Sequence, residues 1–382
     1  MLLRIAATAV SVFASDLLPA TLIAALEPFE CGETNGETPV IMSVVSGQEP
    51  DGTLAFASAQ IEVLKAIDGR IFRFAKNALC ALWLSTQRDR LTLYIRDGAR
   101  DDDGTLTEQA RTLFRLAFEE ISAQNGALSI HASAVIHDGR TVCFTGPSGA
   151  GKSTAAQNFL KSVPDSKMLN ADRPLLRPEN GGFTAYGAPW SGKENVYVNE
   201  SAPLCAIVDI RKHPFCRLQR LDFHSAFILL LQRVSKPLWD GVAAANVLNS
   251  VERVALTVPV YRYYCSNEPG AGEYLAAMLA RPNEIELLDK GEKDMRIKEG
   301  YVMRRLLDNH VAVMAGIKAD GAPVAIMLNT VGAFLWERLL HPTTERALIE
   351  CVLDEFAVDE ATAASDIREF LDSLRSVGAL DE

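Results

Sequence analysis

A glycine-rich segment, 146-GPSGAGKS-153, lies between an apolar run at 141–144 and a helix-like run at 155–163. It fits the pattern G-x-x-x-x-G-K-[ST] at every specified position. Glycines let backbone N–H groups turn inward on phosphate oxygens, and a helix that starts directly afterwards adds its positive end. The segment therefore predicts a phosphate-binding loop between a strand and a helix, and no other feature constrains the fold of this chain as strongly.

The residue types of this loop suggest how each position contributes. We expect Lys152 to reach the β- and γ-phosphates and the Ser153 hydroxyl to ligate Mg²⁺, so that ATP and Mg²⁺ are the predicted cofactors. The loop alone does not distinguish ATP from GTP. The predicted nucleotide-binding residues are Gly146, Ser148, Gly149, Ala150, Gly151, Lys152, Ser153 and Thr154.

Size and charge narrow the classes of protein that remain. With 382 residues, the chain is long enough for two or three domains. Its formal charge of −11 disfavours a dedicated nucleic-acid binder, because phosphate backbones attract surfaces rich in lysine and arginine. Seven scattered cysteines without a CxxC pair indicate reduced thiols rather than a disulfide framework or a zinc site.

Hydropathy predicts no membrane span, because no apolar run approaches the roughly 20 residues that cross a bilayer. The N-terminal segment 1–15 resembles a secretion signal, but it reads equally well as a first strand. A loop that uses ATP favours a cytoplasmic protein. We therefore expect a cytoplasmic chain without a membrane partner.

Patterning divides the chain into three units and a linker. Residues 1–127 read as an α/β support domain, with strands at 71–76 and 91–98 and a helix over 107–122 that Thr107 would cap. Residues 128–280 hold the phosphate loop, and the polar segment 281–295 reads as a linker. Residues 296–382 show three strands, at 301–307, 310–317 and 323–328, and then three helices, near 330–340, 343–356 and 359–377. The predicted fold class is α/β (α+β overall), with a small winged-helix-like domain at the end.

Two side chains near the loop have the chemistry of a phosphotransfer site. His131 lies on the strand-like segment before the loop, in 127-ALSIHASAVIHDG-139. Asp172 ends an apolar run, 168-MLNADRPLL-176, where an Mg²⁺-binding carboxylate is expected. Each also has a simpler interpretation, His131 as a core histidine and Asp172 as a turn residue. Trp190, in 186-YGAPWSGK-193, fits an acceptor site and a buried position equally well.

Taken together, these segments resemble the HPr kinase/phosphorylase superfamily. The resemblance covers about 150 residues and includes His131, the loop, Asp172 and a late Pro259-Val260 segment. It implies phosphoryl transfer from a nucleotide to a hydroxyl, and family relatives are often homo-oligomers. Lys152, Asp172 and His131 are then the catalytic residues, and Ser153 and Asp172 are the metal ligands.

This chain departs from that family at one position. The family has two adjacent aspartates, whereas this sequence reads Ala171-Asp172. If Asp172 binds the metal, His131 is the natural substitute for the general base. Alternatively, Asp172 performs both tasks, or the protein binds a nucleotide without transferring its phosphate.

The last unit is acidic, which excludes a DNA-binding role for its winged-helix-like pattern. Residues 296–382 contain nine Lys/Arg against fifteen Asp/Glu, and the third helical stretch is itself acidic. The unit instead resembles the PqqD family of peptide-recognition domains, through 326-IMLNTVGAFLWERL-339 and 366-DIREFLDSLRSVGAL-380.

The PqqD resemblance implies that the leader of a ribosomally made precursor peptide adds a strand to the third strand and packs on the third helix. Other peptide-modification enzymes are further expected partners. The expected peptide-binding residues are Val324, Ala325, Ile326, Met327 and Leu328 on the strand, and Ile367, Phe370, Leu371 and Leu374 on the helix.

The combined prediction is an ATP-dependent kinase that phosphorylates a Ser or Thr hydroxyl of a precursor peptide whose leader its last domain holds. Two alternatives stay open. One is a nucleotide-dependent peptide adaptor or scaffold without phosphoryl transfer, which Ala171 favours. The other is a kinase of a small-molecule hydroxyl such as free serine.

Overall fold

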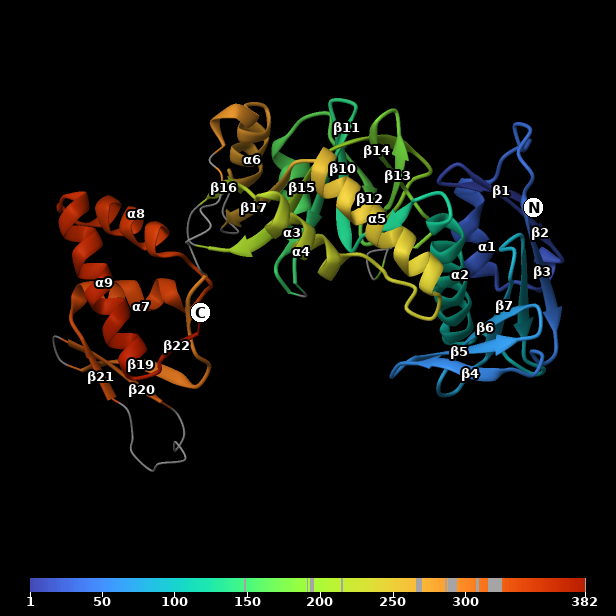
Figure 1. Cartoon of the computed structure of the whole chain (residues 1–382), viewed down its shortest axis with the longest axis horizontal. Helices are drawn as coiled ribbons and strands as arrows, with labels where there is room; N and C mark the ends of the chain where they lie inside the picture. Colours follow the sequence, from blue (N-terminus) through green and yellow to red (C-terminus); the bar gives the residue numbers. More distant parts are fainter. Residues whose placement is uncertain are drawn as a thin grey trace.

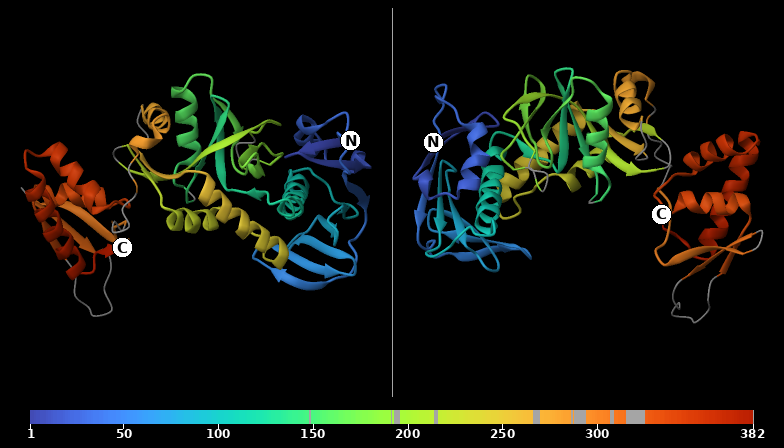
Figure 2. Two further views of the ribbon diagram at one scale, coloured as in Figure 1. Left: turned by 45° about the horizontal axis from the view of Figure 1, so that its top comes forward. Right: turned by 180° about the vertical axis from the view of Figure 1, so that it is seen from behind.

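The computed structural model of the chain describes residues 1–147, 149–190, 192, 196–213, 216–265, 270–285, 287, 294–306, 309–314 and 325–381, with backbone alone at 302, 304–306, 309, 313, 314 and 325. The expectation of a mixed α/β chain is confirmed. The unit that contains the phosphate loop lies between the N-terminal and C-terminal units in every view (Figure 1 and Figure 2).

The N-terminal unit is built on an eight-stranded sheet in the order β1-β2-β3-β8-β7-β6-β5-β4. Helix α2 (Thr105–Ala123) packs on β6 and β7 and stands between this sheet and the middle unit (Figure 1). The other elements are β1 (Leu2–Ile5), β2 (Thr8–Phe13), α1 (Ala20–Leu26), β3 (Val40–Ser46), β4 (Thr53–Ala57), β5 (Ile61–Ala66), β6 (Gly69–Phe74), β7 (Cys80–Ser85) and β8 (Arg90–Ile95), with 3₁₀ turns η1 (Ser15–Leu17) and η2 (Glu27–Phe29).

Two local expectations for this unit have clear outcomes. The apolar N-terminal run forms strands β1 and β2. Thr107 does not cap its helix, because α2 begins earlier and its N-cap is Gly104 in a left-handed conformation. The backbone N–H and the hydroxyl of Thr107 instead donate to the Asp101 carboxylate, at 2.9 and 2.5 Å, so the aspartate satisfies the start of the helix.

The middle unit contains a nine-stranded mixed sheet in which β17 pairs in parallel with β15, and β15 with β11. Its strands are β9 (Leu128–Ser129), β10 (Ala132–His137), β11 (Arg140–Thr145), β12 (Lys167–Asn170), β13 (Leu175–Glu179), β14 (Gly182–Tyr186), β15 (Ser201–Lys212), β16 (Arg217–Arg220) and β17 (Val260–Cys265). Its helices are α3 (Lys152–Ser162), α4 (Phe223–Arg233), α5 (Gly241–Thr257) and α6 (Ala271–Leu279), with a 3₁₀ turn η4 (Pro282–Glu284).

Helices cover both faces of this sheet. Alternate residues of a strand point to opposite faces, so Ala134 joins the apolar cluster under α4 and α5, whereas Val135 joins the cluster under α3 and α6. The three parallel strands end at one edge of the sheet. The phosphate loop follows the end of β11 at this edge, which is where α/β sheets usually bind ligands.

The C-terminal unit has a three-stranded sheet in the order β19-β20-β21 and a helical layer. Asn329 caps α7 by accepting a hydrogen bond from Gly332 N at 2.7 Å. The predicted strands and helices are present as β19 (Tyr301–Leu306), β20 (Asn309–Met314), β21 (Ala325–Leu328), α7 (Thr330–Leu339), α8 (Glu345–Glu355) and α9 (Glu360–Ser376). A further pair, β18 (Arg296–Ile297) and β22 (Leu380–Asp381), joins the two ends of the unit.

The two ends of the predicted linker 281–295 pack against their neighbours. Ile285 is buried in the core under α3, and Met295 is buried in the core of the C-terminal unit. His213 Nε2, which directly follows β15, lies 3.2 Å from the Thr343 hydroxyl of the C-terminal unit. None of the helices in the described part of the chain has the length and apolar character needed to cross a bilayer.

Candidate functional site

The phosphate loop connects β11 to α3 in the geometry that its glycines permit. Gly146, Gly149 and Gly151 have φ angles of 152°, 77° and 95°, which side chains disfavour. A Cβ on Gly146 would also lie 3.1 Å from the carbonyl oxygen of Ile210 on the next strand. Glycine is therefore required at these turns on conformational grounds. Ser148, which was also predicted to bind phosphate, lies outside the described residues.

An open hollow of about 320 Å³ lies over the start of α3. Its walls bring together five of the predicted residues, Gly149, Gly151, Lys152, Ser153 and Thr154, and add Lys212 from the end of β15. Sequence reasoning missed Lys212, although a lysine that ends an apolar strand beside the loop was a usable signal. Two lysines that converge on a helix start make this hollow a plausible anion site on electrostatic grounds.

Lys152 lies across its own loop. Its Nζ donates to the carbonyl oxygens of Gly146 and Pro147, each at 3.2 Å. Burial lowers the pKa of Lys152 below its usual value of 10.5, and the nearby negative charge of Asp172 only partly opposes this effect. The Lys152 ammonium therefore contacts uncharged carbonyl oxygens, and a negatively charged phosphate would attract it more strongly.

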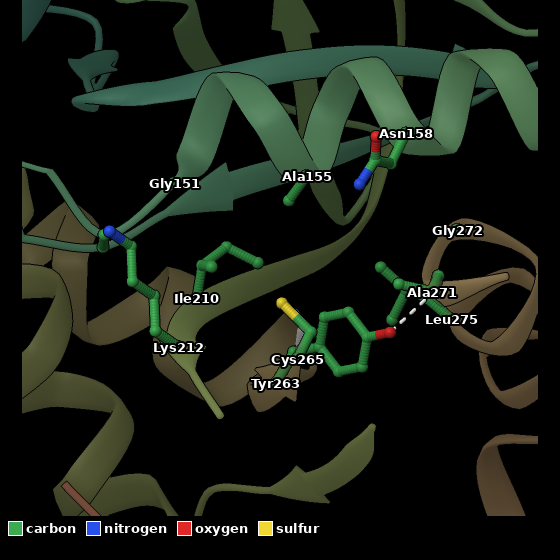
Figure 3. Close-up of a pocket in the computed structure, with 11 residues that line it drawn as sticks. Gly151, Ala155, Asn158, Ile210, Lys212, Tyr263, Cys265, Ala271, Gly272 and Leu275 are labelled. Carbon is green, nitrogen blue, oxygen red and sulfur yellow. Dashed lines mark hydrogen bonds between the residues drawn. The ribbon is translucent and has the colours of Figure 1, made fainter. Parts of the chain in front are cut away.

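Beside the loop, a narrow slot opens between α3 and α6, and Asn158 points into it (Figure 3). The predicted residue Ala150 lines this slot rather than the hollow. Gly272 keeps the two helices close, because a Cβ there would lie 2.6 Å from the Asn158 carbonyl oxygen. Its cavity of about 10 Å³ has room for about one water.

His131 and Asp172 meet at the same edge of the sheet. Nε2 of His131 lies 3.1 Å from Oδ1 of Asp172, and both side chains are partly exposed, at 38% and 29%. The backbone of His131 is fixed on both sides, because its N–H donates to Arg233 O at 2.8 Å and its carbonyl accepts from Thr145 Oγ1 at 2.9 Å. His131 is therefore a partly exposed residue next to Asp172 rather than a core histidine.

A buried asparagine positions Asp172. The Asn170 Oδ1 atom accepts from the backbone N–H groups of Asp172 and Arg173, at 3.0 and 2.7 Å. Its Nδ2 donates to the carbonyl oxygens of Ala188 and Trp190, at 3.1 and 3.2 Å. Sequence reasoning missed this role, although asparagine two residues before an aspartate is a known turn signal.

The Asp172 carboxylate is held in its ionised form. Burial by itself raises its pKa, but the hydrogen bond from His131 and the charge of Arg173 outweigh burial, and the pKa falls below the usual 3.8. Arg173 Nε lies 3.7 Å from the second carboxylate oxygen. At neutral pH the site therefore presents a carboxylate that can orient His131 or bind a cation.

Ala171 does not face this site. Its side chain is 6% exposed and packs in the apolar cluster under α3, while its carbonyl oxygen accepts from Ser133 Oγ at 2.8 Å. Of the two positions, it is Asp172 whose side chain reaches His131. A carboxylate at position 171 in this structure would lie among apolar side chains.

The structure adds Asp209 and Arg233 to the site. Asp209 is fully buried beside Thr145 on β15, pairs with Arg211 Nε at 2.9 Å, and leaves its Oδ1 without a hydrogen-bond partner among the described residues. The charge of Arg233, at the end of α4, helps to lower the pKa of Lys152. An apolar strand that ends in Asp-Ile-Arg was the sequence signal for Asp209.

Of the two positions predicted for Trp190, an acceptor site and a buried one, the structure shows the buried one. Its side chain is 4% exposed, and its ring packs against Phe114 and Phe118 of α2 at centroid distances of 6.2 and 5.6 Å. Its Nε1 donates to the Arg173 carbonyl oxygen at 3.2 Å. The N-terminal unit thus supports the turn that carries Asp172.

A second candidate site is a groove of about 610 Å³ between β21 and α9, which we name the β21–α9 groove. Strand β21 is the edge of its sheet, so one side of its backbone is open among the described strands. The groove is lined by Met327, Leu328, Asn329, Val331, Gly332, Leu335, Asp366, Glu369, Phe370 and Ser373.

The structure corrects part of the predicted peptide site. Ile367, Leu371 and Leu374 have no exposed surface, because these positions of α9 face the core of the C-terminal unit. The face that lines the groove is displaced by one residue and consists of Asp366, Glu369, Phe370 and Ser373. On the strand, Met327 and Leu328 line the groove and Ile326 does not, while Val324 and the side chain of Ala325 lie outside the described residues.

Comparisons with known proteins bear on the C-terminal unit. Residues 319–380 match the family described as Coenzyme PQQ synthesis protein D (PqqD). A solved structure, "TbiB1 in Complex with the TbiA(beta) Leader Peptide", is similar at 22% identity over 22% of this chain and 94% of that chain, with a TM-score of 0.19. No curated protein matches the chain. The family match identifies the C-terminal unit, which contains the β21–α9 groove, as a PqqD-like domain.

Proposed function

We propose that this protein is an ATP-dependent kinase that phosphorylates a Ser or Thr hydroxyl of a precursor peptide, whose leader binds the PqqD-like domain. The observation that carries the proposal is the His131–Asp172 pair beside Lys152, in a chain that also contains a PqqD-like groove. Neither half suffices alone. A phosphate loop does not identify the group that accepts the phosphate, and a peptide groove provides no catalytic residues.

The phosphates of ATP are expected to bind the loop N–H groups, Lys152 and Lys212. Oxygen ligands suit Mg²⁺, and the Ser153 hydroxyl and the Asp172 carboxylate would supply them to a bound ion. The described residues hold no group of three or more His, Cys, Asp or Glu side chains able to bind a metal by themselves, so such an ion would depend on the nucleotide phosphates. When bound, Mg²⁺ offsets the charge that develops on the transferred phosphoryl group.

His131 is the proposed general base. Because Nε2 faces the Asp172 carboxylate, the ring is expected to carry its proton there, which leaves Nδ1 as an acceptor. The acceptor hydroxyl attacks the γ-phosphorus, the bond to the β-phosphate oxygen breaks, and the hydroxyl proton moves to Nδ1. ADP leaves, and His131 returns the proton to solvent.

The direct test is intact-mass analysis of a candidate precursor peptide that binds the PqqD-like domain, incubated with this protein and Mg-ATP. We expect a mass gain of one phosphate that requires the leader and disappears in Lys152→Ala. Lys161→Ala, in the same helix but outside the hollow, is the matched control and should keep the activity.

Two other results would contradict the proposal and support a different function. Leader binding without phosphate transfer would support the nucleotide-dependent adaptor, which the burial of Ala171 away from the site also favours. Phosphorylation of free serine at a rate indifferent to the leader would support a small-molecule kinase.

A further inference from the structure

We propose that the β21–α9 groove selects an extended peptide with an apolar residue and a Lys or Arg two positions away, so that the leader carries a basic, amphipathic strand. This inference deepens the proposed function and rests on its peptide-binding half. It concerns the chemistry of the occupant, which the groove walls constrain.

One half of the groove is apolar. Val331, Leu335 and Phe370 line it, and Met327 on the strand is 62% exposed, which is unusual for a methionine in a folded domain. Gly332 forms part of the lining at a point where a Cβ would touch the Phe370 ring at 3.5 Å. A side chain that covers these residues would remove apolar surface from water.

The other half is acidic, and the described residues that line the groove include no lysine or arginine. Asp366 and Glu369 line the groove, and neither forms a salt bridge in the described part of the chain. The arginines of α9 are engaged elsewhere, because Arg368 pairs with Glu345 at 2.7 Å and Arg375 with Asp372 at 2.7 Å. A peptide that entered with its own acidic residue would meet two like charges.

The spacing of the two halves matches a strand. Asp366 and Phe370 are four residues apart on α9, a rise of about 6 Å along the helix. Side chains on one face of a strand recur every two residues, or about 6.7 Å. A strand that is added to the open edge of β21 and runs along α9 would therefore direct side chains i and i+2 toward Phe370 and Asp366.

The test is selection of random dodecapeptides displayed on phage against the immobilised full-length protein. Four proteins are compared. They are the wild type, the uncharged groove variant D366N/E369Q, the groove-filling variant S373W, and the control E360Q/D372N, which makes the same charge change on α9 outside the groove. Thermal melts confirm that each variant is folded.

We expect the wild type to enrich peptides in which Lys or Arg lies two positions from an apolar residue. The enrichment should persist in E360Q/D372N and disappear in D366N/E369Q, and the selected peptides should not bind S373W. For one synthesised peptide, changing its basic residue to Gln should weaken binding to the wild type about fivefold, and not to D366N/E369Q.

Two results would overturn the inference, and they differ in what else they overturn. Peptides that require an open groove but show no basic excess would remove the charge preference and leave leader binding intact. If no selected peptide is lost in S373W, the groove binds no peptide, and the peptide-binding half of the proposed function fails as well. Phosphotransfer is not part of this measurement, so its failure cannot be mistaken for either result.

Discussion

Lys152 shows how burial prepares a side chain for a ligand. Its pKa lies below the usual value because burial disfavours the ammonium, and Asp172 compensates only in part. A lowered pKa means a larger fraction of neutral amine at any mildly alkaline pH.

We therefore predict that a small amine-acylating reagent modifies Lys152 faster than Lys161, which is exposed on the same helix. The rate at Lys152 should also reach its plateau at a lower pH than the rate of free lysine does, because neutral amine accumulates earlier when the pKa is lowered. Peptide mapping by mass spectrometry over time measures both sites, and Mg-ATP should slow only Lys152. Equal rates at the two lysines would contradict the pKa argument.

His131 and Asp172 can be separated by substitution. If the pair acts as a base and the group that orients it, His131→Asn should lower kcat by about 10²–10⁴-fold while nucleotide affinity stays nearly constant. Asp172→Asn should lower kcat as well, and it should also weaken the dependence on Mg²⁺. Steady-state kinetics with nucleotide titrations measures these effects, and His224→Asn, exposed at the start of α4, is the control.

A different outcome would reassign the base. Should His131→Asn retain full kcat while Asp172→Asn is inactive, then Asp172 alone performs both tasks. Both interpretations were open from the sequence, and the 3.1 Å contact is what favours the pair.

Among the elements, α2 joins the N-terminal sheet to the middle unit through a buried ionic group. The fully buried Glu120 carboxylate lies 3.3 Å from Arg70 Nη1 and 2.9 Å from Arg88 Nε, and it accepts from Trp239 Nε1 at 2.8 Å. Burial raises its pKa even against the charge of Arg70. Removing Glu120 would leave the N–H of the partly buried Trp239 without its acceptor, while Arg70 and Arg88 keep their ion pairs with Asp240, at 2.6 and 2.9 Å.

Glu120→Ala is therefore expected to cost about 1–3 kcal/mol in the free energy of unfolding. Glu108→Ala, on the same helix with a mostly exposed side chain, should change it by less than about 0.5 kcal/mol. Denaturant titration of both variants measures the difference. Similar values for the two would mean that the ionic group does not hold α2 in place.

At the scale of the whole molecule, the proposed function requires the PqqD-like domain to act as a tether. A bound leader raises the local concentration of the following segment at the active site. This can raise kcat/KM for the precursor by about 10²–10⁴-fold. A tether works only when leader and acceptor belong to one chain.

We predict that a separate leader peptide added in trans inhibits phosphorylation of the full precursor and does not rescue a leaderless one. The leaderless peptide should show a higher KM with little change in kcat, because the tether affects the encounter and not the chemistry. Initial rates at several leader concentrations provide the measurement, with a scrambled leader as the control. Activation by leader in trans would point to a conformational switch, for which the contact between His213 and Thr343 would be the first region to examine.

Local sequence patterns determined the phosphate loop and most of the strands and helices of the C-terminal unit. Glycines at 146, 149 and 151, followed by Lys152, identify the loop because few sequences tolerate those backbone angles. The strands and helices of 301–377 follow from hydrophobic period and turn residues, and the match at 319–380 agrees with that pattern. These features depend on neighbours in the chain, which a sequence displays directly.

Only the tertiary structure decided which side chains meet and which way they face. Asn170 positions Asp172, and Trp190 is buried against α2, because segments distant in sequence pack there. On α9, the residues that line the groove each precede the predicted residues by one position. Both sets recur at helical spacing, so the spacing alone did not distinguish the groove face from the buried face. Hydrophobic period predicts that a helix has a buried face, but only the neighbour it packs against determines which residues belong to it.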